Sequence, residues 1–199
     1  MHFDLVTLIK TIGYVGVFGI VFAESGLFFG FFLPGDSLLF TAGFLASQGF
    51  LNFPLLVILC VTGAILGDSV GYSFGKKMGQ ILYSKEDSRF FKKAHLEKAH
   101  AFYEKHGGKA IIIARFMPFV RTFAPIVAGT ANMTYKKFLS YNIIGGILWG
   151  MGVTTAGYVL GQVVPDVDKY LLPIIVLIII VSVAPPAVAY VKNRFHPNR

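Results

Sequence analysis

The chain has 199 residues, of which 55% are hydrophobic and 14% are charged. A mean hydropathy of +0.66 is too high for a soluble domain and predicts an all-α integral membrane protein, with residues 1–199 forming a single polytopic domain. The formal net charge of +8 gathers beside apolar stretches, which marks the cytoplasmic side of a membrane and argues against nucleic-acid binding.

The N-terminal part holds two apolar stretches that differ in continuity. Residues 5–22 form a first hydrophobic element, and because they lack the cleavage pattern of a signal peptide we expect them to be retained. Residues 24–47 are also apolar, but Pro34, Gly35 and nearby glycines divide them into pieces of about ten residues, half the length that crosses a bilayer. We therefore predict a re-entrant hairpin, whose broken backbone must be surrounded by protein or water.

The middle of the chain alternates between apolar and basic stretches. Residues 53–75 are long enough to span a membrane. The basic segment 76–109 carries aromatic side chains among its charges at loosely helical spacing, which predicts a cytoplasmic amphipathic segment on the membrane surface. Residues 110–131 are apolar but contain two prolines and two arginines, and we predict that they form a second re-entrant hairpin.

Two further spans complete the predicted topology. Residues 138–161 and 170–191 are apolar and long enough to cross, and the basic tail 192–199 is predicted to be cytoplasmic. A short acidic turn at 165–169 then lies outside the cell. With these sides assigned, the second hairpin enters from the cytoplasm and the first from the outside, so the two hairpins are opposed.

A weak internal repeat agrees with this topology. At an offset of 86 residues, Ala42-Gly43 falls on Ala128-Gly129 without a gap. The same offset places Gly71-Tyr72-x-x-Gly75 on Gly157-Tyr158-x-x-Gly161. Because the two copies run in opposite directions through the membrane, the pattern predicts an inverted repeat, an architecture common among transporters.

Five charged side chains lie within the apolar stretches: Glu24, Asp36, Asp68, Arg115 and Arg121. A charge at bilayer depth costs several kcal/mol unless it is paired or hydrated, so such residues are usually functional. We therefore predict that they converge in a water-accessible polar pocket halfway through the membrane.

The two arginines are the candidate phosphate-binding residues. A guanidinium group suits phosphate because its planar fork donates two parallel hydrogen bonds. Pro118 lies between Arg115 and Arg121 and can bend the chain so that both point at one anion. The alternative is structural: the arginines reach the cytoplasmic headgroups, or brace the fold by pairing with Glu24 or Asp36.

The acidic residues are candidates for proton or ion coupling. Glu24 and Asp36 come to a similar depth if the first hairpin folds back, and a carboxylate in a partly dry site can exchange protons. The alternatives are an ion pair for Glu24 and a helix N-cap for Asp36. Asp68 is a secondary candidate, since it lies in a Gly67, Gly71, Gly75 series that predicts close helix packing and can simply hydrogen-bond a neighbouring helix.

Other reactive side chains form no recognisable site. Cys60 lies alone in an apolar run and is interpreted as a packing residue. His95, His100 and His106 share no helix face, so we predict surface residues and no metal site. No nucleophile and base pair stands out, and the single tryptophan is interpreted as an interfacial or packing residue. We expect neither a cofactor nor an enzymatic activity.

Three motifs together resemble the DedA family, the bacterial branch of the membrane proteins that share the VTT (SNARE-associated Golgi) domain. They are E-S-G…F-L-P-G-D-S-L-L, then G-D-S-V-G-Y-S-F-G-K, then A-R-F-M-P-F-V-R-T…N-x-x-G-x-x-x-W. The resemblance covers about residues 20–161. It implies two opposed re-entrant hairpins, and the family's important acidic pair matches Glu24 and Asp36 while its arginine pair matches Arg115 and Arg121.

The resemblance also implies a function at the bacterial inner membrane. Members of the family are implicated in moving lipids between leaflets, so we expect a multi-pass lipid flippase with a cytoplasmic C-terminus. The first candidate substrate is undecaprenyl phosphate, recycled from the outer to the cytoplasmic leaflet with ion or proton coupling. The alternatives are translocation of phosphatidylethanolamine or another phospholipid, and proton-coupled transport of a small solute or drug. The expected partners are membrane lipids, and the sequence leaves homo-oligomer formation open.

Overall fold

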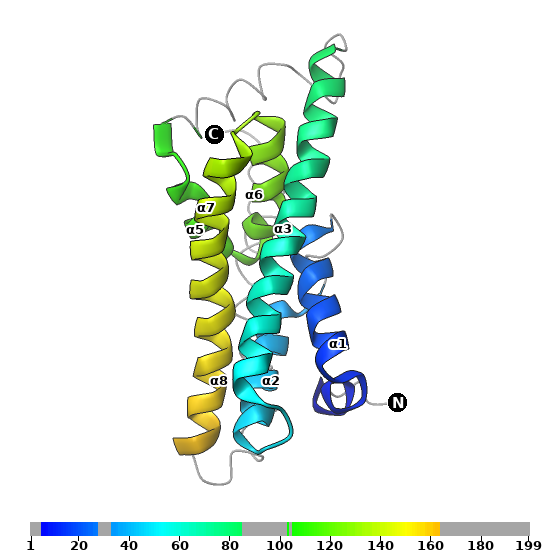
Figure 1. Cartoon of the computed structure of the whole chain (residues 1–199), viewed down its shortest axis with the longest axis vertical. Coiled ribbons are helices and arrows are strands. Elements are labelled where there is room, and N and C mark those ends of the chain that lie inside the picture. Colours follow the sequence, from blue (N-terminus) through cyan, green and yellow to red (C-terminus); the bar gives the residue numbers. More distant parts are fainter. Residues whose placement is uncertain (1–4, 28–32, 85–102, 104, 164–199) are drawn as a thin grey trace, which may run out of the picture.

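The computed structural model describes residues 5–27, 33–84, 103 and 105–163, and these are helical apart from short turns and connections (Figure 1). The elements are α1 (Leu5–Gly26), α2 (Gly35–Ser47), α3 (Phe53–Ser84), α5 (Lys109–Arg115), α6 (Pro118–Thr130), α7 (Tyr135–Gly146), the π-helical turn η2 (Ile147–Met151) and α8 (Gly152–Val163). The described part contains no strand. The predicted all-helical fold is thus confirmed for these residues.

Two long helices form the frame of the bundle. One is α3, and the other is the continuous rod made by α7, η2 and α8 (Figure 1). Their segments Phe53–Gly79 and Tyr135–Val163 are long and apolar enough to cross a membrane, and Ile12–Gly26 is a shorter apolar helix. The predicted spans 53–75 and 138–161 fall within the two long helices. The predicted span 170–191, the tail 192–199 and most of the segment 76–109 lie outside the described residues.

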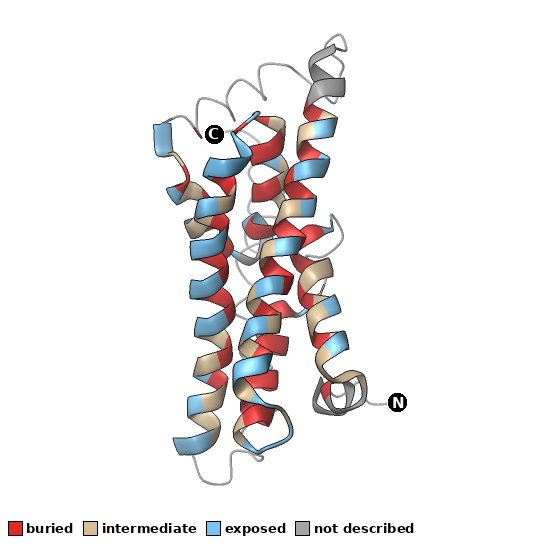
Figure 2. Ribbon diagram, in the orientation of Figure 1, coloured by how far each residue is buried: buried red, intermediate tan, exposed pale blue. Residues whose placement is uncertain are grey.

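The outward faces of the bundle are apolar. Figure 2 shows that α3 and α8 alternate between a buried inner face and an exposed outer face. Large hydrophobic side chains are exposed on α3 (Ile58, Leu66 and Phe74), on η2 (Leu148) and on α8 (Val159). An exposed apolar surface of this extent is typical of contact with lipid. The helix α3 also continues past Lys76 and Lys77, where the sequence predicted that a polar segment would begin.

A row of glycines on α3 lets two other helices approach its backbone. Glycine occupies every fourth position from Gly63 to Gly79, so the row winds slowly around α3, and it faces α1 at Gly63 and Gly67 and α6 at Gly75 and Gly79. A side chain at Gly67 would meet the carbonyl of Phe22 on α1, and one at Gly75 would overlap the carbonyl of Ile126 on α6. The predicted role of this series in close helix packing is confirmed.

The second long helix uses the same device. A side chain at Gly157 on α8 would overlap the carbonyl of Phe40 on α2, and one at Gly43 on α2 would overlap the carbonyl of Thr154. The helices α2 and α8 therefore pack backbone to backbone, as α6 and α3 do. Each long helix therefore packs closely against a short helix that is distant in the sequence: α3 against α6, and α8 against α2.

The buried apolar side chains form two clusters, one at each end of the bundle. The first contains Ala64 of α3 and Trp149 of η2, and the second contains Tyr72 of α3 and Phe138 of α7. Asp68 lies between the two clusters along α3, and Asn142 lies between them along α7. The polar positions of both long helices thus fall at the same middle level.

Candidate functional site

Arg121 joins the ends of three helices. It lies in the first turn of α6, and its guanidinium group donates hydrogen bonds to Glu24 in the last turn of α1 and to Asp36 in the first turn of α2. The distance from Nη1 to Oδ1 of Asp36 is 2.7 Å. Glu24 is 1% exposed, Arg121 8% and Asp36 21%, so this is a largely buried ion cluster with its opening at Asp36.

Trp149 covers this cluster from the second long helix. Its indole Nε1 donates a hydrogen bond of 2.7 Å to the same oxygen of Asp36 that Arg121 contacts. The Cζ atom of Arg121 lies 4.7 Å from the centroid of the Trp149 ring, within the range of a cation–π interaction. Trp149 lies in the π-helical turn Ile147–Met151, and such turns are frequent at functional sites.

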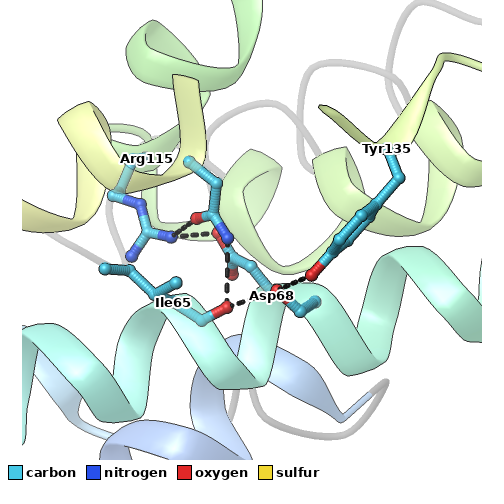
Figure 3. Close-up of polar contacts among 6 residues, drawn as sticks. Ile65, Asp68, Arg115 and Tyr135 are labelled. Carbon is cyan, nitrogen blue, oxygen red and sulfur yellow. Dashed lines mark hydrogen bonds and ion pairs between the residues drawn. The ribbon is translucent and has the colours of Figure 1, made fainter. Parts of the chain in front are cut away.

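Arg115 makes a separate polar cluster, drawn in Figure 3. It ends α5 and forms a buried ion pair with Asp68 of α3. Its Nη2 also donates to Oδ1 of Asn142 on α7 at 2.5 Å, and Nδ2 of Asn142 donates to the carbonyl of Ile65 at 3.0 Å. The guanidinium group is therefore held between the two long helices.

The two clusters are neighbours. The Cζ atom of Arg115 lies 5.8 Å from the centroid of the Trp149 ring, the same ring that Arg121 faces. The structure thus brings the five predicted site residues into one largely buried region, in two groups that both lie near Trp149. Pro118 begins α6, and the helix is interrupted at Phe116 and Met117, so the predicted bend lies between the two arginines. The bend does not aim both arginines at one partner, because each pairs with different carboxylates.

The Arg121 cluster is incompletely satisfied within the described residues. Two carboxylates face one guanidinium group, and both Oε2 of Glu24 and Nε of Arg121 are buried without a hydrogen-bond partner there. By contrast, Arg115 forms its ion pair with the single carboxylate of Asp68, so the two charges balance. Gly35 lies at the start of α2, and a side chain there would overlap the Glu24 carboxylate, so only glycine lets this helix start approach it. The positive end of α2 then favours the carboxylate charge.

Two residues of the site escaped the sequence analysis in these roles. Asn142 was not considered, and Trp149 was interpreted as a packing or interfacial residue. Both belong to the motif N-x-x-G-x-x-x-W, whose spacing was the available signal. The N-cap alternative for Asp36 is wrong, because Pro34 is the N-cap residue of α2 and Asp36 lies in the first turn with its side chain on Arg121.

The described residues contain no group of three or more metal-binding side chains. His95 and His100 lie outside the described residues, and His106 is exposed, as predicted. Cys60 is buried in the first apolar cluster, in agreement with its interpretation as a packing residue.

Comparison with known proteins identifies the family. The model of the VTT domain matches residues 33–159. Protein DedA of Escherichia coli K12 is 46% identical over 201 residues, which cover 98% of this chain and 91% of that protein. The chain belongs to the DedA family of VTT-domain membrane proteins.

Other members of this family are also similar. The inner membrane protein YqjA of Escherichia coli K12 is 35% identical over 174 residues, covering 83% of this chain and 79% of that protein. An uncharacterized membrane protein of Mycobacterium leprae is 49% identical over 170 residues, covering 85% of this chain and 76% of that protein. These relatives agree with a membrane location. No solved structure matches the chain.

Proposed function

We propose that this protein moves a phosphate-bearing lipid across the bacterial inner membrane. Undecaprenyl phosphate, carried from the outer to the cytoplasmic leaflet, is the first candidate substrate. The observation that carries the proposal is the Arg121 cluster, in which a buried guanidinium group faces two carboxylates and its Nε has no hydrogen-bond partner among the described residues. A lipid needs such a polar site only for its headgroup, because its tail stays in the bilayer.

The chemistry of the cluster supports an exchange of partners. A phosphate group can replace Glu24 or Asp36 on Arg121, since phosphate accepts the same paired hydrogen bonds from the guanidinium fork. The displaced carboxylate then takes up a proton or another cation, because an unpaired buried negative charge is costly. Substrate binding and proton uptake would thus be coupled through the guanidinium group of Arg121. Arg115 would supply a second phosphate contact, with Asp68 as its resting partner.

The packing of the glycines supports an inverted repeat. Gly43 on α2 meets α8, and Gly129 on α6 meets α3 at the carbonyl of Tyr72, which agrees with the offset of 86 residues for these short helices. On the long helices the packing pairs Gly157 with Gly75 and not with Gly71, so the two copies differ there by four residues, about one helical turn. In a membrane, α5 and α6 would form one re-entrant hairpin and the start of α2 the other, with the C-terminus cytoplasmic.

A proton-coupled carrier of a small solute or drug is the second candidate. The observation that favours it is the burial of Glu24 and Arg121, which are 1% and 8% exposed, because a soluble substrate needs an enclosed site. Phosphatidylethanolamine or another phospholipid remains an alternative cargo for the lipid function.

The test is a headgroup-accessibility assay in proteoliposomes. Fluorescent undecaprenyl phosphate and phosphatidylethanolamine analogues are offered separately, and the fraction exposed to an outside quencher is followed over time. We expect flipping by the native protein, its loss in Arg121→Gln and Glu24→Gln, and its retention in the control Lys136→Gln/Lys137→Gln, whose side chains are exposed on α7. Unchanged flipping in both site variants refutes the proposal.

A further inference from the structure

The structure holds a cavity that lies outside the charged site. It has a volume of about 650 Å³, within the range of about 300–1,000 Å³ that is usual for ligand pockets, and it opens between α5 and α6. None of the five charged site residues lines it. We call it the α5–α6 groove; its lining residues are Tyr103, Lys105, His106, Lys109, Ala110, Ile113, Ala114, Met117, Val120, Phe123, Ala124 and Val127.

The groove lies on a different face of the hairpin from the arginines. On α6, Val120, Ala124 and Val127 share one face at helical spacing and line the groove, whereas Arg121 points into the bundle. On α5, Ala114 lines the groove and the next residue, Arg115, is buried against α3. The lining side chains and the arginines therefore point in different directions from the same two helices.

The polarity of the groove changes along its length. Lys105 and Lys109 line one end and are exposed, and no acidic side chain lines the groove among the described residues. Apart from Tyr103 and His106, the rest of the lining is apolar, and Ile113 is 62% exposed. From Lys109 to Met117 the chain covers about 12 Å at the helical rise of about 1.5 Å per residue. One end thus suits an anion and the remainder suits a hydrocarbon chain.

We propose that the α5–α6 groove binds one anionic phospholipid from the cytoplasmic leaflet, with its acyl chain along α6 and its phosphate at Lys105 and Lys109. The lysine end lies on the side that the basic residues assign to the cytoplasm. The positive charges of Lys105 and Lys109 favour an anionic lipid over a zwitterionic one. This binding goes beyond the proposed translocation and does not require it.

Site-specific photo-crosslinking tests this inference. The photoreactive residue p-benzoylphenylalanine is placed at position 127 in the groove and, as a control, at position 58 on the outer face of α3, where Ile58 is 59% exposed. The full chain is reconstituted in nanodiscs of equal parts phosphatidylglycerol and phosphatidylcholine, irradiated and analysed by intact mass spectrometry. Position 120 provides a second groove probe if the first variant does not fold.

We expect phosphatidylglycerol to be captured at least about fivefold over phosphatidylcholine at position 127, the gain that one basic residue gives near an anionic lipid surface. Position 58 should capture the two lipids equally. Lys105→Gln/Lys109→Gln should abolish the preference, whereas the matched control Lys136→Gln/Lys137→Gln should keep it.

Three results overturn the inference: equal capture at position 127, a preference that survives loss of Lys105 and Lys109, or a crosslink from position 127 to another part of the same chain. Flipping is measured separately in proteoliposomes. If the groove binds phosphatidylglycerol but no lipid is flipped, only the proposed function fails. If flipping proceeds while the groove shows no preference, only this inference fails.

Discussion

The ion pair of Arg115 and Asp68 allows a quantitative test of how this bundle tolerates buried charge. Both side chains are at least nine-tenths buried, and among the described residues each is the other's only ion-pair partner. We therefore predict that the variants Arg115→Gln and Asp68→Asn each destabilise the protein strongly. The double variant should be far more stable than the two single effects would give by addition.

The size of the expected destabilisation follows from the cost of burying an unpaired charge. Breaking a buried pair by removing one partner costs about 3–5 kcal/mol, because the remaining charge is buried and uncompensated. At about 2–4 °C per kcal/mol for a chain of this size, each single variant should lower the melting temperature by about 6–20 °C. Replacing both charges is often nearly neutral. Because Asn142 can still hydrogen-bond two amide side chains, the double variant should melt within about 4 °C of the native protein.

The assay is thermal unfolding of the purified protein in one detergent at fixed concentration. Lys136→Gln serves as the control, since this exposed charge should change the melting temperature little. If the double variant melts as low as the sum of the single shifts, Arg115 and Asp68 are not coupled and the geometry of Figure 3 is refuted. A stable double variant that cannot flip lipid would show that Arg115 also contacts the substrate.

Two further predictions concern Trp149 and the glycines of α8. Trp149→Phe removes the indole donor to Asp36 but keeps a ring over Arg121. One hydrogen bond to a charged group is worth about 1.5–3 kcal/mol, so flipping should slow by about tenfold to a hundredfold. Trp149→Leu also removes the cation–π contact and should slow it further. Equal rates in the native protein and both variants would exclude a role for this ring. Gly157→Ala should lower the melting temperature, because its methyl group overlaps the carbonyl of Phe40. Gly152→Ala has open space around it and should raise the melting temperature slightly through helix propensity. The opposite order of melting temperatures would contradict the packing.

Local patterns in the sequence predicted the parts of this fold that depend on neighbours along the chain. Glycines four residues apart must share a helix face, so the packing surface of α3 could be read from Gly67, Gly71 and Gly75 alone. Pro118 lacks the amide hydrogen needed within a helix, so a break between Arg115 and Arg121 was also predictable. The cost of charge in an apolar stretch singled out the residues that the structure then brings together.

The sequence offered an arginine paired with Glu24 or Asp36 as an alternative, and the contacts of Arg121 confirm that pairing. Which arginine takes which acid could not be predicted. Arg115 and Asp68 are 47 residues apart, and Arg121 and Glu24 are 97 apart, so only tertiary packing decides the pairs. The place of Trp149 depends on the π-helical turn at Ile147–Met151. Such a turn shifts the face on which later side chains lie, and nothing in the local composition announces it.

The two arginines are chemically alike, but their surroundings fit different tasks. Arg115 has one carboxylate and one anchored amide, so its charge is balanced and any substrate must displace a complete set of contacts. Arg121 shares its charge between Glu24 and Asp36, and one of these can leave while the other still compensates the cation. The free-energy barrier to exchange should therefore be lower at Arg121. If phosphate enters this site, Arg121 is where it binds first, and Asp36, the more exposed of the two acids, is the partner that it displaces.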